Sequence, residues 1–455
     1  MRRKITEKLI EWKERKEKKP VLIYGARQVG KTYIIEDFAK KYYKNSIYIN
    51  FEKMPVFISF FDSDISPSKL MSIFETHFNT KITAGETLII FDEIQVCERA
   101  LTSLKYFAED APNQHVIGAG SLLGVAINRE KYSFPVGKVE MMTLYPLDFE
   151  EYLEALGKTH FVEIIKEHYG NMSPVSAIIH SELLNDYKTY LTVGGMPMAV
   201  KSFRDEKNYN NVSAALNSIL NAYIADMAKY SDSNESVRIR GAYESIPAQL
   251  AKENKKFQYK LIRKGASATL FGSSIHWLEI AGVVLKCIKV ERGEVPLPAF
   301  KDFSSFKLYM SDVGLYCAKA LIPPENILSG NLPDVIKGAI SENFVAQTLR
   351  TNGFELFYWE SNYQAEVDFV IQKGTAVIPV EVKYETHTRS RSLNSFVQKY
   401  ASPYSIRISS KNFGFENNIK SVPHYAAFCI TPTDDTNFLA YLEQKSITIQ
   451  DYNPK

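Results

Sequence analysis

One stretch, residues 21–32 with the sequence VLIYGARQVGKT, constrains the fold of this chain more than any other. Its first four residues are apolar and predict a short buried strand. Ile34, Ile35, Phe38 and Tyr42 follow at helical spacing. Between them, residues 25–32 match the pattern GxxxxGK[ST]. A strand, a glycine-bounded loop and a helix form the setting in which this pattern binds phosphate, which favours function over a chance match in a glycine turn.

The residues of this loop have separate expected roles. Gly25 and Gly30 permit backbone angles that side chains disfavour. The loop amides would then meet phosphate oxygens at the positive end of the helix. Lys31 is expected to reach the β- and γ-phosphates of ATP, and Thr32 to hold Mg²⁺. The expected nucleotide-binding residues are Gly25, Ala26, Arg27, Gln28, Val29, Gly30, Lys31 and Thr32.

Two acidic residues end the next strongly apolar run, TLIIFDE at residues 87–93. Such a run suits a central strand of a parallel sheet and a Walker B element. Asp92 is then expected to hold Mg²⁺ through water, and Glu93 to act as the base that orients the attacking water. The alternative is a strand that merely ends in acids. Ser121, after an apolar strand at 115–120, is either a sensor of the γ-phosphate or a turn serine.

Several segments, taken in this order, resemble a family of bacterial and archaeal P-loop ATPases of the AAA-like class. They are GARQVGKT, LIIFDEIQ, GAGSLLG, VGKVEMMTLYPLDFEEYL, YLTVGGMPMAV, AYIADMAKY, FKLYMSDVGLY and GAISENFVAQTL. The resemblance spans most of the chain and implies an α/β P-loop NTPase core, a helical lid, a winged helix-turn-helix and a restriction-endonuclease-like α/β domain. We place these domains at residues 1–150, 151–235, 236–300 and 301–455.

The resemblance does not supply an arginine finger. Relatives often have Gly-Arg where this chain has Gly137 and Lys138, so that role is not transferred to position 138. Arg99 and Arg129 are the nearby alternatives, although an arginine at either position is more often a surface residue. Without a clear finger, a monomer, a dimer and a larger oligomer all stay open.

Residues 236–300 read as helix, basic turn, helix and β-wing, which is the order of a winged helix-turn-helix. The turn is KENKKFQYKLIRKG, and the wing would have Arg292 and Gly293 at its tip. Double-stranded DNA is the expected partner, because basic side chains can contact its phosphates. Those side chains are Lys252, Lys255, Lys256, Lys260, Arg263 and Lys264. The alternative is a protein-docking or lid module with a solvated basic face.

The C-terminal part has the element order of the PD-(D/E)XK nuclease core. A helix at 339–352 precedes three strands, a second helix and a further strand. Glu381 and Lys383 are two residues apart in a strand and therefore share a face. Asp368 and Glu381 would hold Mg²⁺, Lys383 would offset developing charge, and Glu342 would complete the site. The alternatives are a constellation that no longer cleaves DNA and a salt-bridged strand face.

Composition adds mainly exclusions. The net charge of the 455 residues is +3, so global charge does not argue for nucleic acid. The four cysteines lie far apart without a CxxC pair, which suggests neither a disulfide scaffold nor a zinc site and fits a reducing, cytoplasmic location. The N-terminal twenty residues mix acidic and basic side chains and are unlike a targeting peptide. No apolar stretch approaches the length of a membrane span.

The expected function is therefore ATP binding and hydrolysis, coupled to DNA binding or to Mg²⁺-dependent DNA cleavage by the C-terminal domain. The alternative is an ATP-gated interaction switch whose nuclease-like domain is a non-catalytic binding platform. A kinase of a small molecule is the weakest hypothesis, because no acceptor-site motif accompanies the loop.

Overall fold

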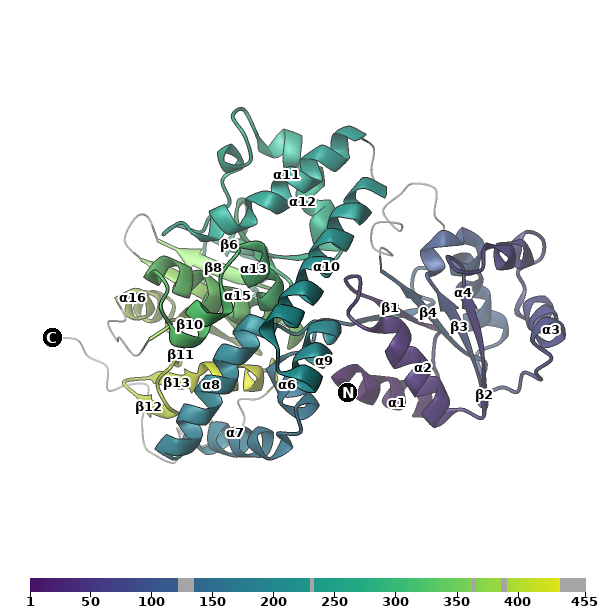
Figure 1. Cartoon of the computed structure of the whole chain (residues 1–455), viewed down its shortest axis with the longest axis horizontal. Coiled ribbons are helices and arrows are strands. Elements are labelled where there is room, and N and C mark those ends of the chain that lie inside the picture. The colour runs from purple at the N-terminus through teal and green to yellow at the C-terminus, as the bar shows by residue number, and fades with distance from the viewer. Residues whose placement is uncertain (122–134, 230–232, 362–364, 386–390, 434–455) are drawn as a thin grey trace. The chain divides into compact units, whose positions relative to one another are not determined.

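The structure is a computed structural model that describes residues 1–121, 135–229, 233–361, 365–385 and 391–433 (Figure 1). The chain divides into two compact units, each of which contains its own sheet. Unit 1 contains Met1–Tyr145 and His276–Val283, and unit 2 contains Pro146–Ile275 and Val284–Lys455. Within the described part of the chain, no helix is both long and apolar enough to cross a bilayer.

Unit 1 is built on a parallel sheet in the order β2-β3-β4-β1-β5. Every residue of β3 and β4 is buried, as expected for near-continuous apolar strands covered on both faces. β4 separates β1 from β3, so three strands end side by side at one edge of the sheet. The strands are β1 (Val21–Tyr24), β2 (Asn45–Asn50), β3 (Thr87–Asp92), β4 (His115–Gly120) and β5 (Glu140–Thr143).

Helices cover both faces of this sheet (Figure 1). α3 and α4 contribute Leu70, Phe74, Leu101 and Leu104 to a core that also contains buried residues of β2 and β3. α2 packs against the sheet through Ile35 and other apolar residues, with α1 beside it. The helices are α1 (Lys4–Glu14), α2 (Lys31–Tyr42), α3 (Pro67–Phe78) and α4 (Glu98–Asp110), with short 3₁₀ turns η1 (Pro55–Phe61) and η2 (Ile94–Val96).

Unit 2 begins with a run of helices. The first, α6, opens at Asp148, whose carboxylate accepts the amide of Glu151 in a reciprocal capping box. The helices of this run are α6 (Phe149–Ala155), α7 (Thr159–Asn171), α8 (Ala177–Val193), α9 (Pro197–Glu206), α10 (Tyr209–Lys229), α11 (Ser233–Leu250) and α12 (Ala268–Ile280), with η3 (Tyr259–Leu261) between the last two. The C-terminal end of α12 falls within unit 1.

The sheet of unit 2 joins strands from two predicted domains. Its order is β12-β13-β11-β10-β9-β8-β6-β7. The expected wing is the antiparallel pair β6 (Val284–Val290) and β7 (Lys301–Met310), and β6 also pairs in parallel with β8. The remaining strands are β8 (Phe357–Glu360), β9 (Glu366–Lys373), β10 (Ala376–Val382), β11 (Ser405–Ser409), β12 (Gly414–Glu416) and β13 (Ile419–Pro423). The wing strands and the C-terminal strands therefore share one sheet.

Four helices and two 3₁₀ turns complete the described part of unit 2. β8, β9 and β10 form an antiparallel meander, and β11 runs parallel to β10. The helices and turns are α13 (Val313–Lys319), α14 (Pro324–Ser329), α15 (Asp334–Thr351), α16 (Arg391–Tyr400), η4 (Leu297–Phe300) and η5 (His424–Cys429). The helix and strands predicted between residues 339 and 409 are thus present in the predicted order.

A buried polar network joins three of the sequence segments that carry the resemblance. The Asp312 carboxylate accepts hydrogen bonds from the amides of Gly195, at 2.6 Å, and Leu315, at 2.9 Å. Burial raises the pKa of this carboxyl to about 6, although these amides favour the charged form. Gln347 accepts the amide of Val313 and donates to the hydroxyl of Tyr190. These segments therefore hold unit 2 together.

Candidate nucleotide site and carboxylate cluster

The glycine-bounded loop lies between β1 and α2, as the sequence predicts. Gly25 has φ +149°, and a Cβ there would lie 2.1 Å from the carbonyl oxygen of Leu144. Gly30 has φ +96° and directly precedes the first residue of α2. Both positions therefore require glycine, one for lack of space and the other for its left-handed backbone. The loop amides stand at the N-terminal, positive end of α2.

Lys31 and Thr32 begin α2 and face the interior of this loop region. Lys31 is buried, and its ammonium donates to the carbonyls of Gly25 and Ala26, both at 2.9 Å. The Thr32 hydroxyl donates to Oδ2 of Asp92 at 2.8 Å. The P-loop threonine and the acid at the end of β3 are thus in direct contact. Hydroxyl and carboxylate oxygens are hard ligands that suit Mg²⁺, so these two residues fit the expected ion.

Two further donors, both from β2, converge on Asp92. The Tyr48 hydroxyl donates to Oδ2 at 2.7 Å, and the Asn50 amide donates to the same oxygen at 3.1 Å. Burial and the nearby Asp92 carboxylate raise the pKa of Tyr48 well above its usual value, which keeps it a donor. The sequence analysis did not single out these residues. Their signal was their polarity in the alternating strand SIYIN, whose pairing with β3 was not evident from sequence.

Glu93 follows Asp92 in a left-handed backbone conformation, with φ +49° and ψ +43°. This conformation is uncommon for a residue with a side chain and often marks a functional position. One carboxylate oxygen accepts from the Gln95 amide at 2.6 Å, and the other lies 3.5 Å from the Ser121 hydroxyl. Ser121 directly follows β4, which separates β1 from β3. The predicted base and the predicted sensor therefore come together.

Arg3 supports the loop from the N-terminus, a role not predicted from the sequence. The residue is 4% exposed, and its guanidinium donates to the Val29 carbonyl at 3.1 Å and to the Tyr145 carbonyl at 2.6 Å. Arg3 directly precedes α1, whose buried face consists of Ile5, Leu9 and Trp12. The N-terminal helix thus fixes a buried cation against the outer side of the phosphate-binding loop.

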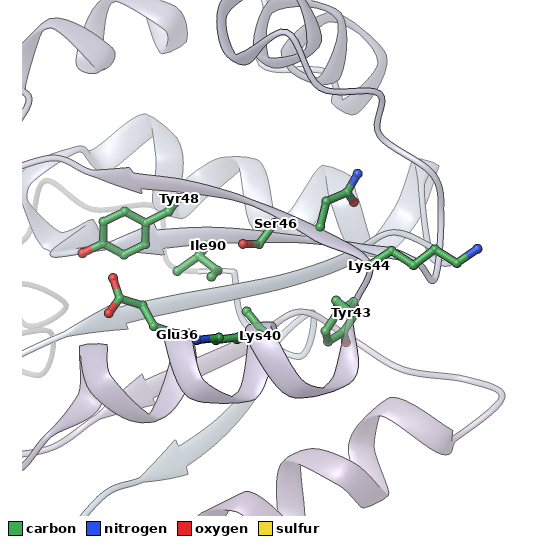
Figure 2. A pocket seen from close by; sticks show the side chains of 9 residues that line it. Glu36, Lys40, Tyr43, Lys44, Ser46, Tyr48 and Ile90 are labelled. Carbon is green, nitrogen blue, oxygen red and sulfur yellow. The ribbon is translucent and has the colours of Figure 1, made fainter.

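A separate groove lies between α2 and β2 (Figure 2). Its volume is about 380 Å³, and Glu36, Lys40 and Tyr48 are among its lining residues. None of the loop residues 25–30 lines it, so it is not the nucleotide site. The Tyr48 hydroxyl, which lines this groove and donates to Asp92, connects it to that site.

The candidate finger residues have other contacts. Arg99 donates to the carbonyls of Phe61 and Ser63 and so fixes the chain after η1. Lys138 forms an ion pair with Glu109 at 3.0 Å. Arg129 lies outside the described residues. No arginine finger is therefore identified among the described residues.

In unit 2, the predicted nuclease-like residues come together from three elements. Glu342 belongs to α15 and Asp368 to β9, while Glu381 is on β10 and Lys383 directly follows it. Glu381 and Lys383 share a face, since their charged groups are 3.5 Å apart. Glu342, Asp368 and Lys383 line a cavity of about 530 Å³.

Basic residues that the sequence analysis did not place here neutralise this cluster. Glu342 pairs with Lys255 at 2.7 Å and with Lys307 at 3.8 Å. Lys307 is 1% exposed and also pairs with Glu366. Arg407 on β11 lies directly opposite Glu381 in the register and pairs with it at 3.2 Å. Each partner comes from a different element, so sequence spacing gave no signal for them.

The carboxyls of buried Glu342 and half-buried Asp368, which both line the cavity, differ in the direction of their pKa shifts. Burial raises the pKa of Asp368 to about 7, and the nearby Glu342 carboxylate adds to the effect. The pKa of Glu342 lies below its usual value, because Lys255 and Lys307 outweigh the opposing effect of burial. The Asp368 carboxylate also accepts the amide of Val382 at 2.8 Å.

The predicted C-terminal metal site does not fit a divalent ion in this arrangement. Among the described residues, no group of three or more His, Cys, Asp or Glu side chains could hold a metal ion. Glu342 faces two lysines, and Glu381 faces Arg407 and Lys383. Side-chain cations therefore occupy the carboxylates of Glu342 and Glu381, whereas Asp368 accepts a backbone amide.

Sequence comparison supports the interpretation of the N-terminal part as a P-loop ATPase domain. Residues 17–153 match the family model of an AAA domain. This match supports an AAA-like P-loop ATPase domain, as the sequence predicts. Residues 184–326 and 337–426 match models described as domains of unknown function, DUF8612 and DUF4143.

Two curated proteins of Methanocaldococcus jannaschii are similar to the chain. Uncharacterized protein MJ1637 is 24% identical over 239 residues, which are 50% of this chain and 48% of that protein. Uncharacterized protein MJ1544 is 27% identical over 368 residues, or 77% of this chain and 71% of that protein. The matched region thus spans about half the length of MJ1637 and 71% of the length of MJ1544.

Among solved structures, a Walker-type ATPase of Pyrococcus abyssi aligns with 70% of this chain and 95% of its own, at 16% identity and a TM-score of 0.43. The ORC1 protein of Aeropyrum pernix, solved with DNA, aligns with 72% of this chain and 90% of its own, at 14% identity and a TM-score of 0.26. The ORC2 protein of that organism aligns with 75% of this chain and 94% of its own, at 14% identity and a TM-score of 0.33. With TM-scores below 0.5, these similarities carry no argument.

Proposed function

We propose that the protein binds and hydrolyses ATP at the loop of unit 1. The observation that carries this proposal is the 2.8 Å contact between Thr32 and Asp92, which joins the start of α2 to the end of β3. A random GxxxxGK[ST] match would have no reason to meet the acid of a second motif sixty residues later. The AAA-domain match over residues 17–153 supports the same activity.

In this proposal each residue has a defined task. The amides of residues 25–30 and the Lys31 ammonium bind the phosphates, for which Lys31 exchanges its contacts with Gly25 and Ala26. Thr32 and Asp92 would hold Mg²⁺, which neutralises charge on the phosphate oxygens when it is bound. Glu93 would orient the attacking water, and Ser121, whose hydroxyl lies 3.5 Å from Glu93, would sense the γ-phosphate.

Two variants test the proposal. Lys31→Ala should abolish ATP hydrolysis, because the ammonium that binds the β- and γ-phosphates is lost. Glu93→Gln should still bind ATP but turn over about 10² to 10³ times more slowly, since the amide cannot act as a base. ATP binding is measured by calorimetry and turnover by phosphate release. Unchanged turnover in Lys31→Ala would remove the assignment, and loss of binding in Glu93→Gln would make Glu93 structural.

For unit 2 we propose a winged helix followed by a PD-(D/E)XK-like domain that acts on DNA under the control of the nucleotide. The order α15, meander β8-β9-β10, α16 and parallel β11 supports the second part. The sequence α11, turn, α12 and hairpin β6–β7 supports the first. Lys252, Lys260 and Lys264 are exposed on the basic turn and available to DNA phosphates.

The second candidate function is an ATP-gated switch that binds DNA or protein without cleavage. The neutralisation of Glu342 and Glu381 by lysines and Arg407 favours it. Nicking of supercoiled plasmid in Mg²⁺ or Mn²⁺ separates the two candidates. Cleavage by the wild type that is lost in Asp368→Ala would exclude the switch, and absence of cleavage would favour it.

A further inference from the structure

Lys255 and Lys307, which both pair with Glu342, differ in how firmly the fold holds them. Lys307 belongs to β7, is fully buried and has a second carboxylate partner in Glu366. Lys255 instead belongs to the turn between α11 and η3, where Lys252, Glu253 and Asn254 are exposed. Lys307 is therefore a fixed part of the core, whereas Lys255 reaches Glu342 from the surface.

Lys255 enters the site as a single side chain from this turn. α11 ends at Leu250, and the Phe257 amide donates to the Phe306 carbonyl at 2.8 Å, so the turn is anchored at both ends. Between these anchors, the Lys255 side chain is only 12% exposed, and its ammonium lies 2.7 Å from Oε1 of Glu342. The other oxygen of Glu342 accepts from the Tyr309 hydroxyl. Both oxygens are therefore occupied.

α15 leaves space for this lysine. Gly338 lies one turn before Glu342 on the same face of the helix. A Cβ at Gly338 would lie 3.8 Å from the Lys255 ammonium. The path by which Lys255 reaches the carboxylate thus runs over a position without a side chain. The same cavity opens onto Asp368 and Lys383.

We propose that Lys255 is an internal latch: its ammonium takes the place of a metal ion beside Glu342 and so holds the C-terminal carboxylate site closed to divalent cations. The lysine occupies Oε1 of Glu342 and supplies the positive charge that a metal ion would otherwise bring. Withdrawal of Lys255 leaves Glu342 and Asp368 facing the cavity with Lys307 as the remaining counter-ion of Glu342. The latch rests on the proposed nuclease-like role of unit 2.

The test is Mn²⁺ binding by the nucleotide-free, full-length protein, measured by calorimetry and by the EPR signal of free Mn²⁺. Lys255→Met removes the charge and keeps a stem of similar length, so it should bind one Mn²⁺ at least about tenfold more tightly than the wild type. Lys255→Arg retains the cation and should behave as the wild type. Lys252→Met, in the same turn but exposed, is the matched control and should also behave as the wild type.

A second substitution tests whether Asp368 belongs to the Mn²⁺ site that Lys255→Met creates. Asp368→Asn in the Lys255→Met background should abolish the gained Mn²⁺ binding. Lys255→Gln, with a melting temperature within a few degrees of the wild type, guards against a folding defect in Lys255→Met. Equal Mn²⁺ binding by the wild type and by both Lys255→Met and Lys255→Gln would overturn the latch, as would an equal gain in Lys252→Met. ATP turnover and plasmid nicking test the proposed function separately, so the two proposals can fail independently.

Discussion

At the scale of single residues, the nucleotide site depends on side chains that bring distant parts of the chain to one point. Thr32, Tyr48 and Asn50 all donate to one oxygen of Asp92. The two motifs that contain Thr32 and Asp92 could be predicted because the residues of each motif are contiguous in sequence. Tyr48 and Asn50 could not, since their role arises only when β2 pairs with β3. Arg3 was missed for the same reason, because its acceptors are 26 and 142 residues away.

Arg3→Ala should destabilise unit 1 by about 2–4 kcal/mol, because two carbonyls lose charged donors in a buried site. ATP affinity should fall as well, since Val29 belongs to the phosphate-binding loop. Arg2→Ala is the matched control: Arg2 is exposed and pairs with exposed Glu7, so its loss should cost less than about 1 kcal/mol. Thermal unfolding and ATP calorimetry measure the two effects. Equal effects of both substitutions would show that Arg3 does not anchor the loop.

At the scale of elements, the sequence predicts what is periodic and local, and misses what depends on partners. The apolar runs of β1, β3 and β4 lie where the sequence predicts them, because buried parallel strands are almost wholly apolar. β5 was not predicted: Glu140–Thr143 is short, mixed in polarity and defined by its pairing with β1. Gly194 and Gly195 separate α8 from α9. Both positions lack space for a side chain, since Cβ atoms there would lie 2.3 Å from Asp312 and 1.9 Å from Leu147.

The packing of α1 and α2 against β4 should make unit 1 sensitive to acid. His115 begins β4 beside Trp12, and the Tyr43 hydroxyl lies 2.8 Å from its Nδ1. Burial, with smaller contributions from Lys18 and Lys13, lowers the pKa of His115 to about 4. Below about pH 6.5 the unfolded chain therefore binds a proton that the folded unit does not, and stability falls as the pH falls toward 4.

Between pH 7 and pH 5 this histidine alone should reduce the free energy of unfolding by about 2 kcal/mol. His115→Gln removes the titrating group, so the variant should be less stable at pH 7 but lose less stability on acidification. Urea unfolding of unit 1 at the two pH values measures the difference, with tryptophan fluorescence from Trp12 as the signal. A variant whose stability falls by the same amount as that of the wild type would contradict the role of His115.

At the scale of the whole molecule, the path of the chain shows which segments build each unit, and the order of motifs along the sequence does not. The chain leaves unit 1 after Tyr145, forms the helices of unit 2, and returns to unit 1 with His276–Val283 before it enters β6. Sequence analysis placed this returning segment inside a separate winged helix, because the close approach of Gly282 to Ala26 leaves no local pattern in the sequence. β6 and β7 likewise join the C-terminal strands in one sheet. The predicted limits at residues 235 and 300 stay predictions.

The returning segment gives the last prediction, because Gly282 packs directly on the phosphate-binding loop. A Cβ at Gly282 would lie 3.1 Å from the amide nitrogen of Ala26, which is tighter than ordinary contact. Gly282→Ala should therefore displace the loop and weaken ATP binding by about tenfold, with a smaller effect on the stability of the fold. Gly265→Ala is the matched control: Gly265 has φ +79°, close to the +73° of Gly282, but nothing lies within 4 Å of its Cβ position. Both substitutions carry the same backbone strain of about 1 kcal/mol, so the difference between them in ATP calorimetry isolates the contact with Ala26. If the two variants bind ATP equally well, residues 276–283 do not shape the nucleotide site.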